Sequence, residues 1–191
     1  MSEKKNALHS SPGKDPALLE KYISGCAEGD SGALSELYTA VSSSVFAYAL
    51  SVLKNRQDAE DVLHDCFINI CSAAAGYTSL GKPMAWIMTI ARNLCMNTLK
   101  DRRRRADVDD GDWESCLSES LSISEEDRLT VRACMTELSD TERKILLLHA
   151  VSGFKHREIA DFLSMPLATV LSKYSRALKK LRSILEKEIS P

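Results

Sequence analysis

Apolar side chains recur at helical spacing along almost the whole of this chain, and the strict alternation that indicates β-strands is absent. Only five prolines and eight glycines interrupt the pattern. One periodic block extends from about Leu18 to Arg105, and a second extends from about Glu126 to Glu188. These two blocks predict an all-α protein with two helical domains.

The segment between the blocks, ADVDDGDWESCLSESLSIS, is rich in acidic residues and serine and has little periodicity. Such a composition favours an extended, flexible acidic linker, and a spacer with no role of its own is an equally open interpretation. We therefore expect a polar N-terminal tail over residues 1–17, a helical domain over residues 18–105, the linker over residues 106–125 and a second domain over residues 126–191.

The second block contains the pattern of a helix-turn-helix. Ser139 and Glu142 form a capping box, SDTE, at the start of an apolar helix that Gly153 ends. A short amphipathic helix is expected over residues 155–163, followed by a turn at residues 164–166 and a longer helix. When two helices are joined by a tight turn and the second has a basic outer face, that second helix typically enters the DNA major groove.

The longer helix, PLATVLSKYSRALKKLR, has an apolar side and a polar side. The apolar side is formed by Leu167, Val170, Tyr174, Ala177, Leu178 and Leu181, and the polar side by Thr169, Ser172, Lys173, Arg176 and Lys180. Short donors and cations near the start of such a helix suit base edges, whereas Lys179 and Lys180 stand where phosphate contacts are expected. A solvated basic face on an ordinary helical hairpin is the alternative.

The first block carries an acidic helix face. Asn55 can cap a helix that runs through DAEDVLHDCFINIC, with Ala59, Val62, Leu63, Cys66 and Ile70 on its apolar side. Asp58, Asp61 and Asp65 form a row on the opposite side. Because a row of acids repels itself and would repel phosphate, it indicates a protein docking surface, with a simply solvated face as the alternative.

A further helix opens at Lys82-Pro83 and has a polar side of mixed chemistry. That side is formed by Trp86, Thr89, Asn93, Asn97, Lys100 and Arg104. Amides, hydroxyls and cations beside an indole suit single-stranded or partly melted nucleic acid, where bases stack on aromatic rings and phosphates contact cations. Trp86 as an ordinary core residue is the competing interpretation.

The formal net charge of −2 hides a strong local asymmetry. Residues 92–105 sum to +5 and residues 173–187 also sum to +5, whereas residues 107–127 hold nine acidic residues and no Lys or Arg. The two basic segments fall within the two helices that are expected to contact nucleic acid.

Composition and motifs exclude several other classes of protein. The six cysteines are scattered without metal-binding spacing and are expected to be reduced core thiols. With no hydrophobic signal core and no apolar run as long as a membrane span, we expect a cytoplasmic protein. Walker loops, nucleophile elbows, metal-ligand clusters and dinucleotide fingerprints are absent from the sequence, so we expect no enzyme activity, no cofactor and no small-molecule substrate.

Three stretches resemble a known family. DAEDVLHDCF, AWIMTIARNLCMNTLKDRRR and LSDTERKILLLHAVSGFKHREIADFLSMPLATVLSKYSRALKKLR look like regions 2 and 4 of the extracytoplasmic-function (ECF) sigma factors of bacterial RNA polymerase. The resemblance covers roughly residues 18–104 and 126–185, and three motifs in this order are far more specific than any one. It implies a promoter-specificity subunit that binds core RNA polymerase and promoter DNA, aids melting, and is held by an anti-sigma factor.

The resemblance also assigns roles to positions in this sequence. Docking on the clamp helices of the largest polymerase subunit is implied for Asp58, Glu60, Asp61 and Asp65, with His64 where glutamine is usual. Recognition and melting of the minus-10 element are implied for Trp86, Arg92, Asn93, Asn97 and Lys100, with residues 75–82 as the loop that captures a flipped nontemplate base. Reading of the minus-35 element is implied for Thr169, Lys173 and Arg176.

Other parts of the chain follow the family less closely. The acidic linker resembles the segment that threads toward the active-site and RNA-exit channels of polymerase. Ser164 and Ala168 stand where glycine is usual, and Leu171 and Lys173 replace a lysine and an arginine. These departures bear on minus-35 specificity.

Two other functions stay open from the sequence. An autonomous helix-turn-helix transcriptional regulator, acting without polymerase docking, would account for the second block but not for the aligned faces of the first. A nucleic-acid-processing enzyme could use Asp58, Asp61 and Asp65 to hold magnesium, although such sites usually recruit ligands from more than one element.

Overall fold

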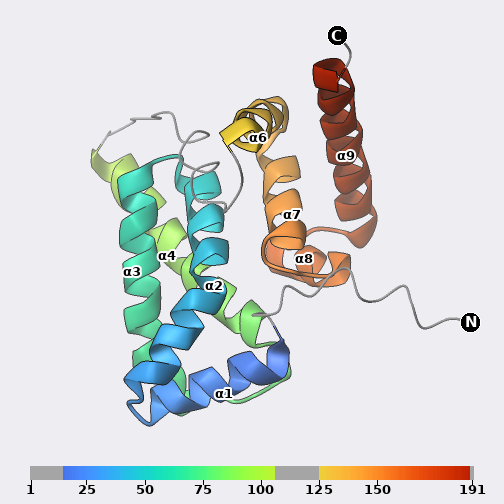
Figure 1. Ribbon diagram of the computed structural model, residues 1–191. Coiled ribbons are helices and arrows are strands. Elements are labelled where there is room, and N and C mark those ends of the chain that lie inside the picture. Colours follow the sequence, from blue (N-terminus) through green and yellow to red (C-terminus); the bar gives the residue numbers. More distant parts are fainter. Residues whose placement is uncertain (1–14, 106–124, 190–191) are drawn as a thin grey trace, which may run out of the picture.

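The computed structural model describes residues 15–105 and 125–189, and every element in these two ranges is helical (Figure 1). The first range holds α1 (Pro16–Ala27), α2 (Ser31–Leu53), α3 (Arg56–Ala73), the short 3-10 helix η1 (Ala74–Gly76) and α4 (Pro83–Arg105). The second holds α6 (Glu125–Glu137), α7 (Asp140–Ala150), α8 (His156–Leu163) and α9 (Leu167–Ile189). The predicted all-α class with two helical domains is confirmed. The expected linker lies, apart from its last residue, outside the described ranges, as do the first 14 residues of the expected tail.

Side-chain caps fix where several helices begin. Asp15 and Asp30 accept hydrogen bonds from backbone N–H groups in the first turns of α1 and α2. Asn55 caps α3 by accepting from the N–H of Asp58 at 3.0 Å, as its sequence predicts. The Ser139 and Glu142 capping box is also present and starts α7.

Helix α2 is the centre of the first domain. Contrary to the sequence expectation, this helix is apolar enough to cross a membrane by length and composition, with a mean hydropathy of 1.2 over 18 residues. However, 56% of that stretch is buried inside the protein. Leu37, Val41 and Leu50 are completely buried, so α2 is a core helix around which α1, α3 and α4 pack.

The cysteines of the described ranges behave as core residues. Cys26, Cys66, Cys95 and Cys134 are buried and Cys71 is half-buried, all as free thiols. Burial raises the pKa of both Cys66 and Cys95 to about 12, which keeps them protonated and unreactive. Cys116 lies outside the described ranges.

In the second domain, α8 and α9 form the predicted helix-turn-helix against α7. Ile159, Phe162, Val170 and Ala177 of these two helices are buried. Leu178, which the sequence placed on the packing side of α9, is instead 43% exposed because it stands at the edge of the apolar stripe.

The two domains pack against each other along α2 and α7, which lie side by side in the middle of the molecule (Figure 1). Ser44 donates to the carbonyl oxygen of Val151 at 3.0 Å, and the ring of Tyr48 meets that of Phe162 edge-on with centroids 5.6 Å apart. Buried apolar side chains of both domains thus form one contiguous core.

Candidate nucleic-acid interface

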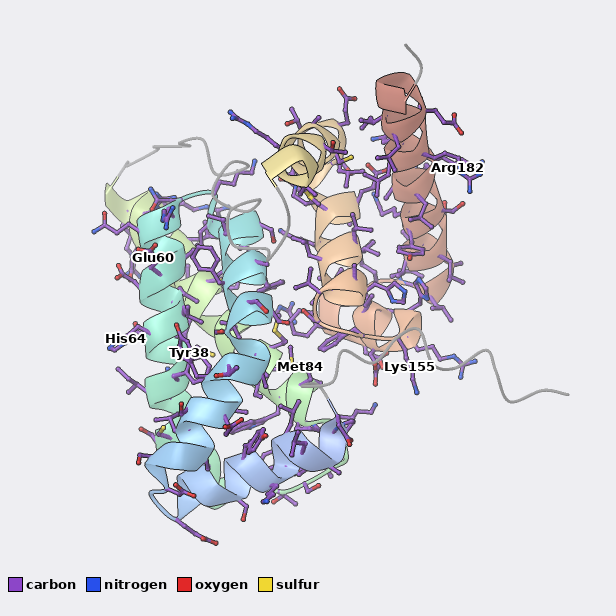
Figure 2. All side chains as sticks on the ribbon, viewed as in Figure 1. Tyr38, Glu60, His64, Met84, Lys155 and Arg182 are labelled. Atoms are coloured by element: carbon purple, nitrogen blue, oxygen red, sulfur yellow. The ribbon has the colours of Figure 1, made fainter. Side chains whose placement is uncertain are left out.

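Most of the expected docking residues lie on the outer face of α3 and are exposed to solvent. Glu60 and His64 project outward from this helix (Figure 2), and Asp61 and Asp65 are also exposed. Glu60 accepts from Arg56 at 2.8 Å, one turn earlier on the same surface. The four side chains are therefore accessible to a large partner.

Asp58 differs from the rest of the acidic row. Its carboxylate lies 2.7 Å from Nε of Arg102, and both side chains are largely buried. Nη1 of Arg102 also donates to the carbonyl oxygen of Leu53 at 3.0 Å, at the end of α2. This pair holds α3, α4 and the end of α2 together, a structural contact that the sequence pattern did not indicate.

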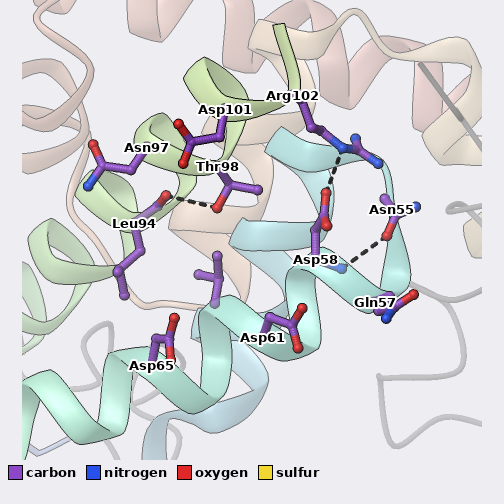
Figure 3. A pocket seen from close by; sticks show the side chains of 11 residues that line it. Asn55, Gln57, Asp58, Asp61, Asp65, Leu94, Asn97, Thr98, Asp101 and Arg102 are labelled. Carbon is purple, nitrogen blue, oxygen red and sulfur yellow. Dashed lines mark hydrogen bonds and ion pairs between the residues drawn. The ribbon is translucent and has the colours of Figure 1, made fainter. Parts of the chain in front are cut away.

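An open groove of about 720 Å³ lies between α3 and α4 beside this pair (Figure 3). Asp61 and Asp65 line it from α3, and Asn97 and Asp101 line it from α4. The expected polymerase-docking and minus-10 residues thus share one groove. Within residues 15–105 and 125–189, no group of three or more His, Cys, Asp or Glu side chains is arranged to hold a metal ion.

The polar side of α4 is open to solvent as expected. Thr89, Asn93, Asn97, Lys100 and Arg104 are exposed, while Ile87 and Ala91 on the opposite side are completely buried. The division follows from helical periodicity, because the buried side packs on α2 and α3. This row of amides, hydroxyl and cations can therefore reach a nucleic acid strand.

Trp86 is half-buried at the start of α4, between the core and the surface. Its ring packs on that of Tyr77, with centroids 4.6 Å apart and planes tilted by 46°. Tyr77 follows η1 in the loop over residues 75–82, to which the family resemblance assigns base capture, but the sequence did not indicate its contact with Trp86. The pair forms an aromatic platform at the end of the polar row.

Arg92 points away from this row and contacts the second domain. Its Nη1 donates to the carbonyl oxygen of Phe162 at 2.9 Å, and its guanidinium carbon lies 5.5 Å from the centroid of the Phe162 ring. In this arrangement the guanidinium is occupied by α8, so it cannot contact DNA until the two domains separate.

On α9, the expected groove-reading residues differ in exposure and in the contacts that they make. Ser172 and Arg176 are exposed, whereas Thr169 and Lys173 are half-buried near the helix start. Lys180 turns back into its own domain, where its ammonium lies 2.9 Å from Oε2 of Glu142 and 3.0 Å from the carbonyl oxygen of Glu137. Lys180 thus fastens α9 to the corner between α6 and α7.

The carboxylate of Glu142 is buried at that corner. The hydrogen bond from Lys180, together with those from Ser139, lowers the pKa of Glu142 to about 2 against the opposing effect of burial. Glu142 therefore completes the cap of α7 and also anchors α9 through Lys180.

A cluster of rings sets the angle between α9 and the preceding helices. The imidazoles of His149 and His156 stack with centroids 4.5 Å apart, and each meets the ring of Tyr174 edge-on. Nδ1 of His149 lies 2.8 Å from the carbonyl oxygen of Phe154. Since these residues come from α7, α8 and α9, their packing fixes the direction in which the polar face of α9 points.

Comparison with known protein families identifies the kind of protein that carries these surfaces. The sigma-70 region 2 family matches residues 37–105, and the sigma-70 region 4 family matches residues 128–181. The two matches cover nearly two thirds of the chain, and each lies within one of the two helical domains. The chain belongs to the sigma-70 family.

Relatives place this sigma factor within the ECF group. It is 26% identical over 175 residues to the ECF RNA polymerase sigma factor SigK of Mycobacterium tuberculosis, covering 88% of this chain and 94% of that protein. SigK of Mycolicibacterium vanbaalenii is 24% identical, over 88% of this chain and 90% of that protein.

Solved structures of similar fold include CnrH in complex with the cytosolic domain of CnrY, with a TM-score of 0.55 and 20% identity over 91% of this chain and 98% of that chain. The sigma factor RpoE of Bartonella quintana, in complex with the anti-sigma factor NepR, has a TM-score of 0.56 and 21% identity, over 82% of this chain and 98% of that chain. This chain is thus an ECF sigma factor that directs promoter recognition, and its family is not enzymatic.

Proposed function

We propose that this sigma factor brings core RNA polymerase to promoters with two elements, reading minus-10 with α4 and minus-35 with α9, and stabilising the melted strand. The observation that carries the proposal is the exposed row of amides and cations on α4 beside the Tyr77 and Trp86 platform. Stacking rings next to cations suit unpaired bases and phosphates, whereas a reader of duplex DNA alone needs no such platform.

For the minus-10 element, we propose that Asn93, Asn97 and Lys100 contact the melted strand and that Thr89 and Arg104 extend the same row. Trp86 and Tyr77 would support a flipped nontemplate base at the loop over residues 75–82. Arg92 would join this surface only after it leaves the carbonyl oxygen of Phe162.

For the minus-35 element, we propose Thr169, Ser172, Lys173 and Arg176 as the groove-reading set. All four stand in the first three turns of α9, and the side chains of Ser172 and Arg176 are free to enter a groove. We leave Lys180 out of this set, because its ammonium is engaged by Glu142 and the Glu137 carbonyl.

For polymerase docking, we propose the exposed residues Glu60, Asp61, His64 and Asp65 of α3, with Asp58 holding the helix in place through Arg102. An acidic surface attracts a basic partner and repels phosphate, so it keeps DNA on the α4 side of the shared groove. We further propose a cytoplasmic location and control by an anti-sigma factor, by analogy with the NepR complex.

The test is binding of the purified protein to core bacterial RNA polymerase, followed by transcription from a pool of randomised promoters. We expect stable binding and protein-dependent initiation at a recurring two-part element. Retained affinity for duplex DNA without polymerase binding would instead support the autonomous regulator. No observation favours that alternative, because a regulator that acts without polymerase would leave the exposed polar faces of α3 and α4 without a function.

A charge reversal on α3 tests the docking surface within the same experiment. Asp61→Lys should weaken binding to core polymerase with the fold intact, because it places a cation within the acidic row. Glu28→Lys, an exposed reversal just after α1, is the matched control and should bind as the wild type does. Unchanged polymerase affinity for Asp61→Lys would remove α3 from the docking proposal.

A further inference from the structure

A carboxylate on α1 holds the loop that leads into α4. Oε1 of Glu20 accepts a hydrogen bond from Oη of Tyr77 at 2.8 Å and another from Oγ of Ser79, also at 2.8 Å. The donors lie 57 and 59 residues further along the chain, so this contact exists only in the folded domain. No motif in the sequence marks Glu20.

The contact reaches both ends of the loop. Tyr77 places its ring against Trp86 of α4, and Ser79 accepts from the N–H of Gly81 at 3.4 Å. Gly81 has φ of +69°, a left-handed turn just before Pro83 begins α4. One carboxylate thus sets both the aromatic platform and the turn that presents Leu80, whose side chain is 83% exposed.

Glu20 is not needed to attach α1 to the domain. Leu19 and Ile23 of the same helix are completely or almost completely buried, and they supply its packing on α2 and α3. Glu20 itself is only half-buried, and within the described residues its carboxylate accepts its two hydrogen bonds from the loop. Glu20 therefore stabilises the loop rather than the hydrophobic core.

The hydrogen bond from Tyr77 to Glu20 persists over the physiological pH range because the phenol stays protonated. Burial, followed by the hydrogen bond to Glu20, raises the pKa of Tyr77 to about 12, so the phenol remains a donor at any physiological pH. A charged acceptor with two hydroxyl donors is a strong arrangement for ordering a surface loop.

We propose that Glu20 is a positioning residue for minus-10 recognition: it fixes the loop over residues 77–82 so that Tyr77 and Trp86 form a ready platform for one unpaired nontemplate base. The inference rests on the proposed function. It predicts that removing the carboxylate loosens the loop, so that the strand must order it during melting and loses discrimination at that base.

The experiment compares variants of the full chain, bound to core RNA polymerase, on promoters that carry each of the four bases at every nontemplate position of the minus-10 element. Open-complex formation is followed by permanganate reactivity of unpaired thymines. Glu20→Ala should reduce discrimination at one position by about tenfold, which is what the loss of two hydrogen bonds can give. Affinity for core polymerase and preference within the minus-35 element should stay unchanged.

Two controls separate positioning from charge. Glu20→Gln keeps an oxygen that both hydroxyls can reach, so it should stay within about threefold of the wild type. Glu28→Ala removes an equal charge just beyond the end of α1 without touching the loop, and should behave as the wild type. If Glu20→Ala and Glu20→Gln change open-complex formation equally, and salt abolishes the change, charge is responsible and the inference is wrong.

A double variant keeps the test decisive if Glu20→Ala does not fold. Tyr77→Phe with Ser79→Ala removes both donors, keeps the ring on Trp86 and leaves α1 intact, so it should lose discrimination at the same position. Wild-type discrimination in this folded double variant would overturn the role of Glu20. If the wild-type protein itself fails to support polymerase-dependent initiation, the proposed function fails instead, before any variant is compared.

Discussion

Single residues on the same helix face have different roles once their contacts are known. The sequence places Lys180 beside Arg176 on the polar side of α9, and both residues are exposed in the folded protein. The ammonium of Lys180 is bound by Glu142 of α7. Residue type and spacing therefore identify the face, while a contact 38 residues away in sequence engages one member of it and leaves the proposed minus-35 reader Arg176 available.

Because the Glu142 carboxylate is buried and hydrogen-bonded, the free energy of unfolding should depend on pH in the acidic range. Its pKa of about 2 lies below the roughly 4.3 of an unfolded glutamate, so its contribution is complete above about pH 4.3 and is lost as the pH falls toward 2. Glu142→Gln should lower the free energy of unfolding at pH 7 by about 1 to 3 kcal/mol and flatten this acid dependence. Urea unfolding at pH 7 and pH 3 would measure both effects. Glu137→Gln, on an exposed side chain, is the control, and an equal loss for Glu142→Gln at both pH values would contradict the assignment.

A substitution of Arg176 tests whether a single residue of α9 recognises a base of the minus-35 element. If its guanidinium contacts a base edge, Arg176→Ala should cost about 1 to 3 kcal/mol on promoters with the preferred base and relax selection at one minus-35 position. The measurement is initiation by the polymerase complex on promoters randomised at minus-35. Lys179→Ala, expected to remove a phosphate contact, should weaken all promoters alike and reduce the salt dependence. A uniform loss for Arg176→Ala would make it a phosphate contact as well.

At the scale of elements, local signals place helix boundaries well. The caps at Asn55 and Ser139 are where the sequence predicts them, and Pro83 begins α4. These signals succeed because a cap depends on residues only two or three positions apart. The turn of the helix-turn-helix is equally local, although Ser164 there adopts a left-handed conformation, with φ of 53°, that glycine adopts more easily.

The strain at Ser164 gives a prediction for the turn. Ser164→Gly should raise the free energy of unfolding by about 0.5 to 1 kcal/mol, because glycine has no Cβ to oppose this backbone conformation. Ser175→Gly, on the exposed side of α9, should instead destabilise by about 0.5 kcal/mol, since glycine is less favourable than serine in a helix interior. Guanidinium unfolding of the full chain compares the two variants. A loss of stability in Ser164→Gly would show that the serine side chain contributes more than its backbone costs.

At the scale of the whole molecule, the two domains form one body. Ser44 and Tyr48 of α2 contact Val151 and Phe162 of the second domain, and Arg92 of α4 donates to the Phe162 carbonyl. Burial lowers the pKa of Lys144 on α7. If Arg92 contacts the minus-10 strand as proposed, it must first leave the carbonyl oxygen of Phe162, so domain packing would compete with that contact.

A charge at the domain contact should open the molecule. Ser44→Glu places a carboxylate where the hydroxyl now donates to a backbone oxygen, and an unpaired buried charge is strongly unfavourable. We expect a larger radius of gyration by small-angle X-ray scattering and tighter binding of pre-melted minus-10 DNA, because Arg92 is released. Ser43→Glu, on the exposed side of α2, should leave both quantities unchanged. An unaltered radius of gyration in a folded Ser44→Glu protein would show that the contact does not hold the domains together.

The sequence by itself determined the all-α class, the two helical domains, most helix starts, and the faces of α3, α4 and α9. Each of these depends on periodicity or on neighbours within one helical turn, which a linear pattern records. Only the tertiary structure decided that Asp58 pairs with Arg102, that Arg92 is held by Phe162, and that Glu20 fixes the loop before α4. Those contacts join residues tens of positions apart, and they arise from how helices pack rather than from what any one helix contains.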